Sequence, residues 1–265
     1  MGTLRKTRII VPCYNESTRL NPKAFLSALE SNANLYFLFV DDGSTDDTLN
    51  LLRYIKKLNP VQVEIMCLAK NYGKAEAVRQ GVITTLNGFF DRVGYWDADL
   101  ATPLDEIDRF CSLLDITNAQ IVIGSRVRLL GKKIERRAMR HYLGRVFATC
   151  ASILLDICIY DTQCGAKIFK NSDSLSRVFS KPFKVNWTFD VEILARFLIV
   201  ENTSPSETSS QWVELPLGEW IDVKGSKVKF KDFIKCGLEI CKLFYYFRTP
   251  AIKSYKKYLH AISGE

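Results

Sequence analysis

The chain has 265 residues, of which 47% are hydrophobic, so it is long and apolar enough to bury a globular core. Its formal net charge is +8, which suits an anionic partner such as a nucleotide, a nucleic acid or an anionic membrane surface. With only two histidines, a zinc site built on histidine is not expected. No stretch reaches the ~18 uncharged apolar residues that a membrane span needs.

The eight cysteines form no C-x-x-C pair, and the sequence shows no signal peptide before the first expected strand. We therefore expect reduced thiols, most of them in the core, in a cytoplasmic protein. Such a chain can touch a membrane without crossing it, and we expect a peripheral position on the cytosolic face of a membrane.

The first half of the chain alternates short apolar runs with amphipathic segments. Runs rich in β-branched and aromatic residues predict strands at 8–14, 36–42, 63–69, 93–99 and 120–125. Amphipathic segments between them predict helices at 46–58 and 104–114. This alternation predicts an α/β fold with a doubly wound, largely parallel sheet. Ligands bind such sheets beyond the carboxyl ends of the strands.

The second half is less regular. A basic segment at 131–145 is followed by an apolar run at 146–155 and by a turn and strand at 161–169. After these we expect a helix at 188–200, an exposed loop at 202–210 and another strand at 212–217. A last helix is predicted at 230–247, with lysines on the face opposite its apolar residues. We expect one domain over residues 1–229. A basic amphipathic helical extension over 230–265 should pack on that domain or on a membrane surface.

Acid-bearing pairs stand at the ends of three predicted strands: Asn15-Glu16, Asp41-Asp42, and Asp97 with Asp99. Asp97 and Asp99 are one residue apart, so on a strand they would share a face. As the chain leaves the sheet, both carboxylates can converge on one hard cation, Mg²⁺ or Mn²⁺. The sequence therefore predicts a metal site beyond this strand.

Several motifs resemble, in their order along the chain, those of the family 2 glycosyltransferases. They are IVPCYNE (10–16), VDDGSTDDT (40–48), KNYGKAEAVRQG (70–81), DADLATP (97–103) and GSR (124–126). Later motifs are similar to those of the dolichyl-phosphate β-glucosyltransferases, relatives of the dolichol-phosphate mannose synthases: DTQCGAKIF (161–169), WTFDVEIL (187–194), WVELP (212–216) and GSKV (225–228). The resemblance implies a GT-A fold, which is a Rossmann-like, mostly parallel twisted sheet flanked by helices. It also implies a nucleotide-activated sugar, a divalent metal and inversion at the anomeric carbon.

The chain departs from that pattern in places. Ala75 and Glu76 stand where the relatives usually have two glycines, and Leu100 stands where they often have one. The eukaryotic glucosyltransferases also carry an N-terminal membrane helix, which we do not expect here. Because of these differences, the resemblance identifies the family more firmly than it identifies the donor sugar or the acceptor.

The strand ends and the resemblance together predict a nucleotide-sugar site. Its expected residues are Pro12, Tyr14, Glu16, Asp41, Asp42, Lys74 and Asp97. A tyrosine can pack on a base, and carboxylates can accept hydrogen bonds from ribose or base N–H groups. The alternative for the run from Asp42 is a turn in which Ser44 or Thr45 caps a helix. For Arg79, a solvated helix face is the alternative to a phosphate contact.

Asp97 and Asp99 are the expected metal ligands, with Mg²⁺ or Mn²⁺ as the metal. A cation that bridges Asp99 to both phosphates would neutralise the charge developing on the leaving nucleotide diphosphate. By resemblance Asp97 also holds the sugar-phosphate. Arg126 and Asp161 complete the expected catalytic set, with Asp161 as the base if the acceptor is a hydroxyl group.

The acceptor side needs positive charge more than it needs a base. A lipid monophosphate is already ionised at neutral pH and can attack the anomeric carbon in line. The expected acceptor-phosphate residues are Arg126, Arg136, Arg137, Arg140, Gln163, Lys167 and Lys227. Arg136 and Arg140 would share a helix face, although a basic run can equally be a solvated surface. By resemblance Trp187, Asp190 and Glu192 line the donor-sugar pocket, with a helix cap as the alternative for Asp190.

These observations predict an inverting, metal-dependent hexosyltransferase that moves glucose from UDP-glucose onto a polyprenyl or dolichyl phosphate. The alternatives are GDP-mannose or another nucleotide sugar as donor, a sugar hydroxyl as acceptor, or an inactive nucleotide-sugar-binding module of a membrane complex. Nucleic acid is not an expected partner, because no RNA-binding sheet motif, zinc finger or helix-turn-helix is recognisable. A membrane surface or membrane subunit is expected, through the basic aromatic segment 230–247, with packing on the domain as the alternative.

Overall fold

The computed structural model describes residues 5–86, 89–135, 138–202, 204–221, 223 and 230–260. Within these ranges, the side chains of 135, 138–141, 208, 230–233 and 260 are not described.

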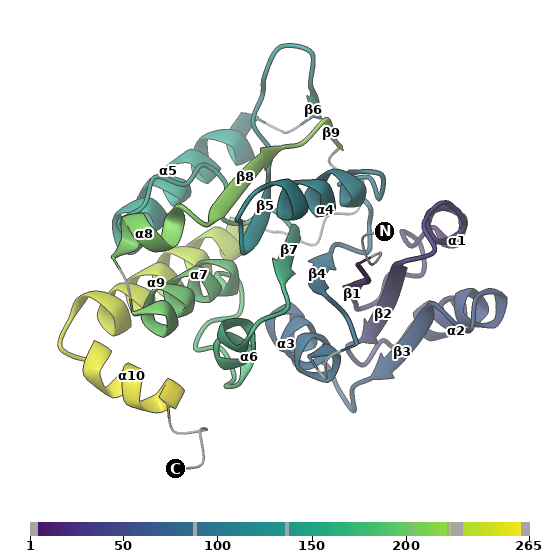
Figure 1. Ribbon diagram of the computed structural model, residues 1–265, viewed down its shortest axis with the longest axis horizontal. Coiled ribbons are helices and arrows are strands. Elements are labelled where there is room, and N and C mark those ends of the chain that lie inside the picture. The colour runs from purple at the N-terminus through teal and green to yellow at the C-terminus, as the bar shows by residue number, and fades with distance from the viewer. Residues whose placement is uncertain are drawn as a thin grey trace.

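Seven strands of the described chain form one sheet, in the order β3-β2-β1-β4-β7-β5-β8 (Figure 1). They are β1 (Thr7–Cys13), β2 (Leu35–Asp41), β3 (Val63–Cys67), β4 (Arg92–Trp96), β5 (Ile121–Ser125), β7 (Ala166–Lys170) and β8 (Trp212–Pro216). Strand β7 runs antiparallel to both of its neighbours, and the other pairs are parallel. The chain order changes direction between β1 and β4, which is where ligands bind in sheets of this type.

Two short strands, β6 (Lys133–Glu135) and β9 (Glu219–Ile221), form a separate parallel pair. The larger helices are α1 (Pro22–Ser31), α2 (Thr48–Leu58), α3 (Lys74–Thr85), α4 (Glu106–Ile116), α5 (Ala138–Leu155), α7 (Phe189–Glu201) and α9 (Phe230–Arg248). The shorter ones are α6 (Asp173–Phe179), α8 (Pro205–Ser209) and α10 (Ile252–His260). Every helix in the described ranges is too short or too polar to span a membrane.

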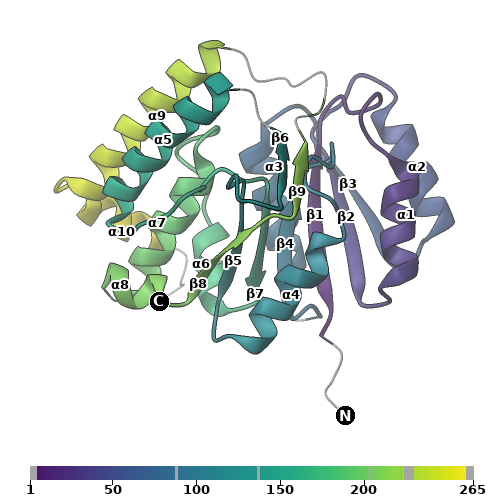
Figure 2. The same ribbon diagram turned by 90° about the horizontal axis from the view of Figure 1, so that it is seen from above.

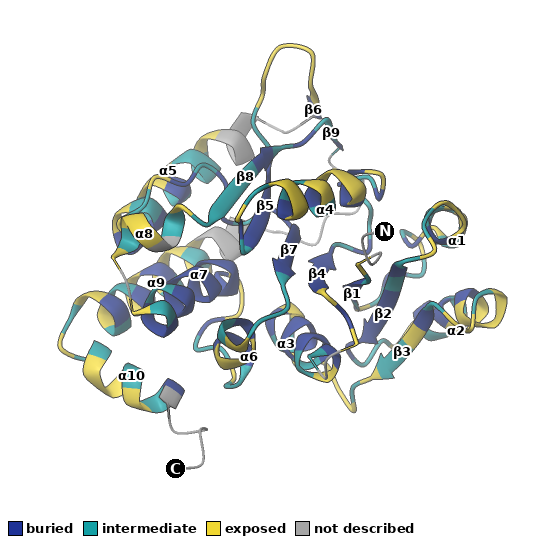
Figure 3. Ribbon diagram, viewed as in Figure 1, coloured by how far each residue is buried: buried dark blue, intermediate teal, exposed yellow. Residues whose placement is uncertain are grey.

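The helices cover the sheet in two layers (Figure 2). Buried residues of α1, α2 and α4 form one core cluster, and those of α3, α5, α6, α7, α9 and α10 form another. Strand β1 contributes to both, because Ile9 and Val11 face the first cluster and Ile10 faces the second. A strand buried on both faces needs a continuous apolar run, which explains why β1 was readable in the sequence. Figure 3 shows the central strands buried and the outer faces of the helices exposed.

The predicted strands and the helices at 46–58, 104–114, 188–200 and 230–247 are confirmed, with boundaries shifted by a few residues. The exposed loop predicted at 202–210 is wrong, because α8 lies inside it. Ser204 and Glu207 form a reciprocal capping pair: the Ser204 Oγ accepts from the Glu207 N–H at 3.3 Å, and the Glu207 carboxylate accepts from the Ser204 N–H at 3.0 Å. With Pro205 at the first helical position, this short sequence favours a helix start.

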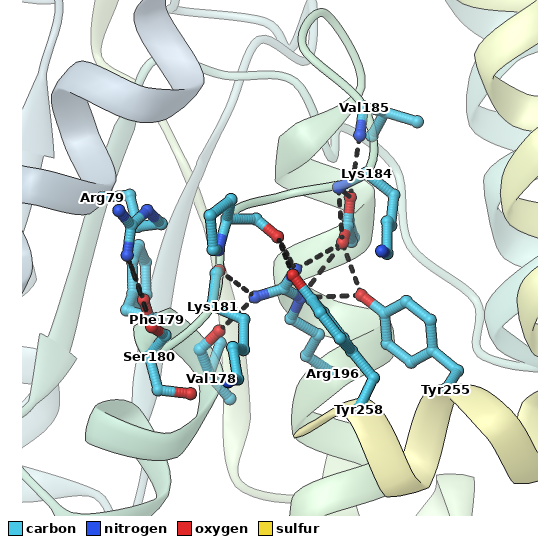
Figure 4. A network of polar contacts seen from close by, with 12 residues as sticks. Arg79, Val178, Phe179, Ser180, Lys181, Lys184, Val185, Arg196, Tyr255 and Tyr258 are labelled. Carbon is cyan, nitrogen blue, oxygen red and sulfur yellow. Dashed lines mark hydrogen bonds and ion pairs between the residues drawn. The ribbon is translucent and has the colours of Figure 1, made fainter. Parts of the chain in front are cut away.

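A buried ion pair ties the last helix to the rest of the domain (Figure 4). Arg196 on α7 is fully buried, 2.7 Å from a carboxylate oxygen of Glu192 and 2.9 Å from the hydroxyl of Tyr255 on α10. It also donates to the backbone carbonyls of Val178, Lys181 and Pro182. Glu192 in turn accepts the N–H groups of Lys184 and Val185. The network therefore fixes both α10 and the segment after α6 against α7.

Replacing Glu192 by glutamine is expected to destabilise the protein by about 3–5 kcal/mol, because it leaves the buried Arg196 charge without its counter-charge. Tyr258→Phe is the control, since its hydroxyl makes one peripheral bond, 3.2 Å to the Pro182 carbonyl, and its loss should cost about 1 kcal/mol or less. Urea unfolding followed by circular dichroism measures both. Equal stability of the two variants would contradict the importance of this ion pair.

Candidate active site

A cleft of about 910 Å³ opens beyond the carboxyl ends of the central strands. Of the residues predicted for the site, the cleft is lined by Pro12, Tyr14, Glu16, Asp42, Lys74, Asp97, Asp99, Arg126, Gln163, Trp187 and Asp190. They come from the end of β1, from the loops after β1, β2, β4 and β5, from the segment before β7, and from the starts of α3 and α7. Residues more than a hundred positions apart thus meet at the switch point of the sheet, as the strand-end argument predicted.

The loops after β1 and β2 are bonded to each other. Asn15 has a φ of 51°, and this left-handed conformation lets its side chain accept from the Thr45 N–H at 2.8 Å. Its own N–H donates to the Ser44 hydroxyl at 3.0 Å. The N-cap of α2 is Asp47, and the preceding Asp46 accepts from the Thr48 N–H at 3.0 Å. The predicted cap at Ser44 or Thr45 is therefore wrong, because those residues are used to join the loops.

Asp46 also fixes the loop after β1, where its carboxylate accepts from the N–H and hydroxyl of Ser17. Although desolvation opposes it, hydrogen bonding from Ser17 and Thr48 lowers the pKa of Asp46 to about 2. The carboxylate therefore stays charged and the two loops stay joined over the whole neutral range.

The two acids at the end of β2 have different surroundings. The Asp42 carboxylate accepts from the N–H groups of Tyr72 at 2.7 Å and Gly73 at 2.8 Å, so it positions the loop that leads into α3. Desolvation raises the pKa of Asp42 in spite of these two hydrogen bonds. Asp41 is buried, is not among the residues lining the cleft, and in the described part of the chain its Oδ1 has no hydrogen-bond partner. Only Asp42 of the expected pair reaches the cleft wall.

Asp97 is held between an ammonium group and a glycine. The Nζ of Lys74, at the first position of α3, lies 2.5 Å from Asp97 Oδ1. A Cβ added at Gly165 would lie 1.8 Å from Asp97 Oδ2, so a larger residue there would force the Asp97 carboxylate out of this position. Burial would lower the pKa of Lys74, but the charges of Asp97, Asp190 and Asp99 raise it overall. The ammonium group is therefore charged at neutral pH.

Asp99 lies in the turn beyond β4. Its Oδ1 accepts from the Ala101 N–H at 3.2 Å, and its Oδ2 lies 3.3 Å from Arg19 Nη1. Leu100, where relatives often have glycine, adopts a φ of 54°, a left-handed conformation that glycine would adopt more easily. Strand β4 ends at Trp96, so both acids occupy the turn rather than one strand face.

The arrangement of Asp97 and Asp99 fits a divalent cation. Both side chains reach the cleft, at 37% and 23% exposure. Desolvation and the neighbouring Asp97 charge raise the pKa of Asp99, and a cation would relieve both effects. No group of three or more His, Cys, Asp or Glu side chains converges within the described ranges. Mg²⁺ and similar cations often take one or two carboxylates and complete their shell with phosphate oxygens and water.

Arg126, which lines the cleft, forms an ion pair with Asp161. The guanidinium binds both Asp161 oxygens, at 2.6 and 2.7 Å, and the Arg126 N–H donates to the same carboxylate at 3.1 Å. Burial would lower the pKa of Arg126, but the charge of Asp161 raises it overall. Glu214 holds this turn by accepting the N–H groups of Tyr160 and Asp161, both at 2.8 Å.

Lys167 is fully buried, and its predicted position against an acceptor phosphate is not what the structure shows. Its ammonium donates to the Cys164 carbonyl at 2.7 Å and to Asp190 at 2.6 Å, and Lys167 does not line the cleft. Tyr95 donates its hydroxyl to the same Asp190 oxygen. Desolvation and the Asp190 charge raise the pKa of Tyr95 well above its ordinary value.

Two expectations at the start of α7 are also wrong: the helix cap considered for Asp190, and the pocket position expected for Glu192. Thr188 is the N-cap of α7, so Asp190 is not the cap and presents its carboxylate to Tyr95 and Lys167. Glu192 lies away from the cleft, in the Arg196 network. Arg79 is buried and paired with Glu76, which excludes the solvated helix face considered for it.

Arg136, Arg137 and Lys227 lie outside the described residues, and Arg140 lies on α5 with an undescribed side chain.

Two site residues were missed by the sequence reasoning. Arg19 bonds Glu16 as well as Asp99, but its place in a short loop gave no periodic signal. Gly165 could have been predicted from the motif that begins at Asp161. A glycine next to a buried strand indicates that another group approaches its backbone closely.

The glycosyl transferase family 2 model matches residues 8–173. The chain is 31% identical over 256 residues to a dolichyl-phosphate beta-glucosyltransferase of Trichomonas vaginalis, covering 92% of this chain and 72% of that protein. The human dolichyl-phosphate beta-glucosyltransferase is 30% identical over 256 residues, covering 89% and 74%.

Among solved structures, glucosyl-3-phosphoglycerate synthase from Mycobacterium tuberculosis, in a complex with Mn²⁺, UDP and glucosyl-3-phosphoglycerate, is similar with a TM-score of 0.67 at 15% identity. The match covers 93% of this chain and 81% of that one, which confirms the expected GT-A fold. The chain is therefore a glycosyltransferase that belongs to family 2, with the dolichyl-phosphate beta-glucosyltransferases among its relatives.

Proposed function

We propose that this protein transfers glucose from UDP-glucose to a polyprenyl or dolichyl phosphate with inversion at the anomeric carbon. The observation that carries the proposal is the pair Asp97 and Asp99 at the switch point of the sheet, inside a cleft that Arg126 also lines. The names of the relatives support glucose as the transferred sugar and dolichyl phosphate as the acceptor. Mycobacterial glucosyl-3-phosphoglycerate synthase, which shares the fold, has been crystallised with Mn²⁺ and UDP-glucose.

On the donor side, Asp97 and Asp99 would hold Mg²⁺ or Mn²⁺. When bound, such an ion neutralises charge on the leaving diphosphate. Lys74, held on Asp97, adds a second positive charge close to the same place. Pro12, Tyr14, Glu16 and Asp42 form the wall where the nucleotide would lie.

On the acceptor side, the geometry favours a nucleophile that needs no base. Both carboxylate oxygens of Asp161, the candidate base, are already bound by the Arg126 guanidinium. A lipid phosphate is already ionised and needs only to be held in line with the anomeric carbon. A sugar hydroxyl would require a base, and Asp161, the candidate for that role, is occupied by Arg126.

Asp99→Asn is expected to lower transfer at least ~100-fold, because it removes a charge placed for the leaving diphosphate. The measurement is metal-dependent transfer of label from UDP-glucose to an organic-extractable product, with dolichyl or undecaprenyl phosphate as acceptor. Asp105→Asn is the control, since Asp105 is exposed and makes no cap hydrogen bond. Transfer from GDP-mannose alone would overturn the proposed donor. A folded protein that turns over no nucleotide sugar would support the inactive module instead.

We further propose that the protein meets its lipid acceptor at an anionic membrane surface. Helices α5 and α9 lie side by side at one edge of the molecule (Figure 2). Each carries large apolar residues that are 58% to 70% exposed at helical spacing: Tyr142, Val146 and Ile153 on α5, and Ile234, Leu238 and Tyr245 on α9. We call these six residues the α5–α9 surface. Lys235 and Lys242 are exposed on α9. Exposed apolar groups with nearby lysines suit an anionic interface.

The opposite face of α9 packs on the domain, where Ile240, Leu243 and Phe247 are buried in the core. The protein is therefore expected to sediment with anionic liposomes at low salt and to be released at high salt. The double variant Leu238→Ser, Tyr245→Ser should bind about tenfold more weakly, whereas Tyr54→Ser, on the exposed side of α2, should not. Equal sedimentation with neutral liposomes, or none with anionic ones, would contradict membrane contact through this surface.

A further inference from the structure

A small chamber opens beside the cleft, between α5 and residues 160–163. Its volume is about 20 Å³, and Arg126, Gly144, Phe147 and Gln163 line both the chamber and the cleft. We call it the side chamber. A space of roughly 10–15 Å³ holds one water-sized group, so the side chamber admits an oxygen atom but not a sugar ring or a base.

The two arginines that line the side chamber are in different states. Arg126 is neutralised by Asp161, which takes two of its N–H groups in a bidentate pair. Arg145, on α5, stacks its guanidinium over the ring of Tyr160 at 3.8 Å. Within the described part of the chain, Arg145 has no carboxylate within ion-pair distance, and its buried Nη1 has no hydrogen-bond partner. Arg145 therefore has charge and donor capacity that the fold itself does not use.

Thr162 offers a second unused polar group in the side chamber. The residue is only 1% exposed, and its Oγ1 likewise has no hydrogen-bond partner among the described residues. A buried donor without a partner costs about 1–3 kcal/mol, and a water molecule or a ligand oxygen in the side chamber would satisfy it. A guanidinium and a hydroxyl facing one small space favour an oxygen of an anion.

We infer that the side chamber receives one oxygen of the acceptor phosphate, with Arg145 Nη1 and Thr162 Oγ1 as its donors. This inference rests on the proposed function, which supplies a lipid phosphate as the anion. Arg126 then forms a wall of the site and holds the Asp161 carboxylate in place, while Arg145 supplies the free positive charge. Val146, the residue after Arg145, belongs to the α5–α9 surface, so the chamber lies close to the proposed lipid surface.

The test uses the full chain and two anions, inorganic phosphate and a polyprenyl phosphate. Arg145→Met and Thr162→Val are expected to raise the KM for polyprenyl phosphate, about 10- to 100-fold for the arginine and severalfold for the threonine, with the KM for UDP-glucose unchanged. Arg145→Lys should recover part of the loss. Arg53→Met, which removes one positive charge from the exposed part of α2, is the matched control and should leave every value unchanged.

Titration of inorganic phosphate by calorimetry, without donor, gives a readout that does not depend on transfer. Wild-type protein should bind phosphate and Arg145→Met should not, with melting temperatures showing that both are folded. Unchanged acceptor KM and unchanged phosphate binding in Arg145→Met would overturn the inference while transfer itself continues. If the wild-type protein transfers no sugar but still binds phosphate through Arg145, the proposed function fails and the anion site stands.

Discussion

The contact of Lys74, Asp97 and Gly165 joins three parts of the chain at the centre of the cleft. Lys74 begins α3, Asp97 follows β4, and Gly165 precedes β7, so the contact fixes the switch point of the sheet. Asp42 supports it, because its carboxylate holds the backbone of Tyr72 and Gly73 and thereby sets where α3 begins. The position of the Asp97 carboxylate therefore depends on a helix start, a strand end and a residue without a side chain.

Charge around the cleft is largely compensated within the protein, in spite of the net charge of +8. Arg126 is paired with Asp161, and Arg19 is paired with Glu16 and lies beside Asp99. Such pairs fix geometry more than they attract ligands, since each arginine already has its counter-charge. Binding of anionic substrates then depends on the few groups with unused donors and on the cation that Asp97 and Asp99 would hold. A basic composition indicated the kind of partner but not the residues that meet it.

The sequence predicted the α/β fold and its strand ends because each signal was local. Apolar runs such as 8–14 and 36–42 belong to strands buried on both faces, and the acids that follow them lie where parallel strands place ligands. Roles that depend on distant partners were not readable. Lys167 looked like a surface cation, but Asp190, 23 residues later, and Tyr95, on the neighbouring strand, enclose it. The helix α8 could have been found from its capping sequence, whereas the burial of Glu192 follows only from the packing of α10.

The central claim is that Asp97 and Asp99 together hold a divalent cation at the start of the diphosphate site. The most direct measurement is a crystal structure with Mn²⁺ and UDP-glucose, in which anomalous scattering locates the metal. We predict one strong peak within coordination distance of Asp99, with Asp97 beside it, Lys74 still on Asp97 and phosphate oxygens completing the shell. A peak elsewhere in the cleft, or UDP-glucose bound with no metal near Asp99, would contradict the account.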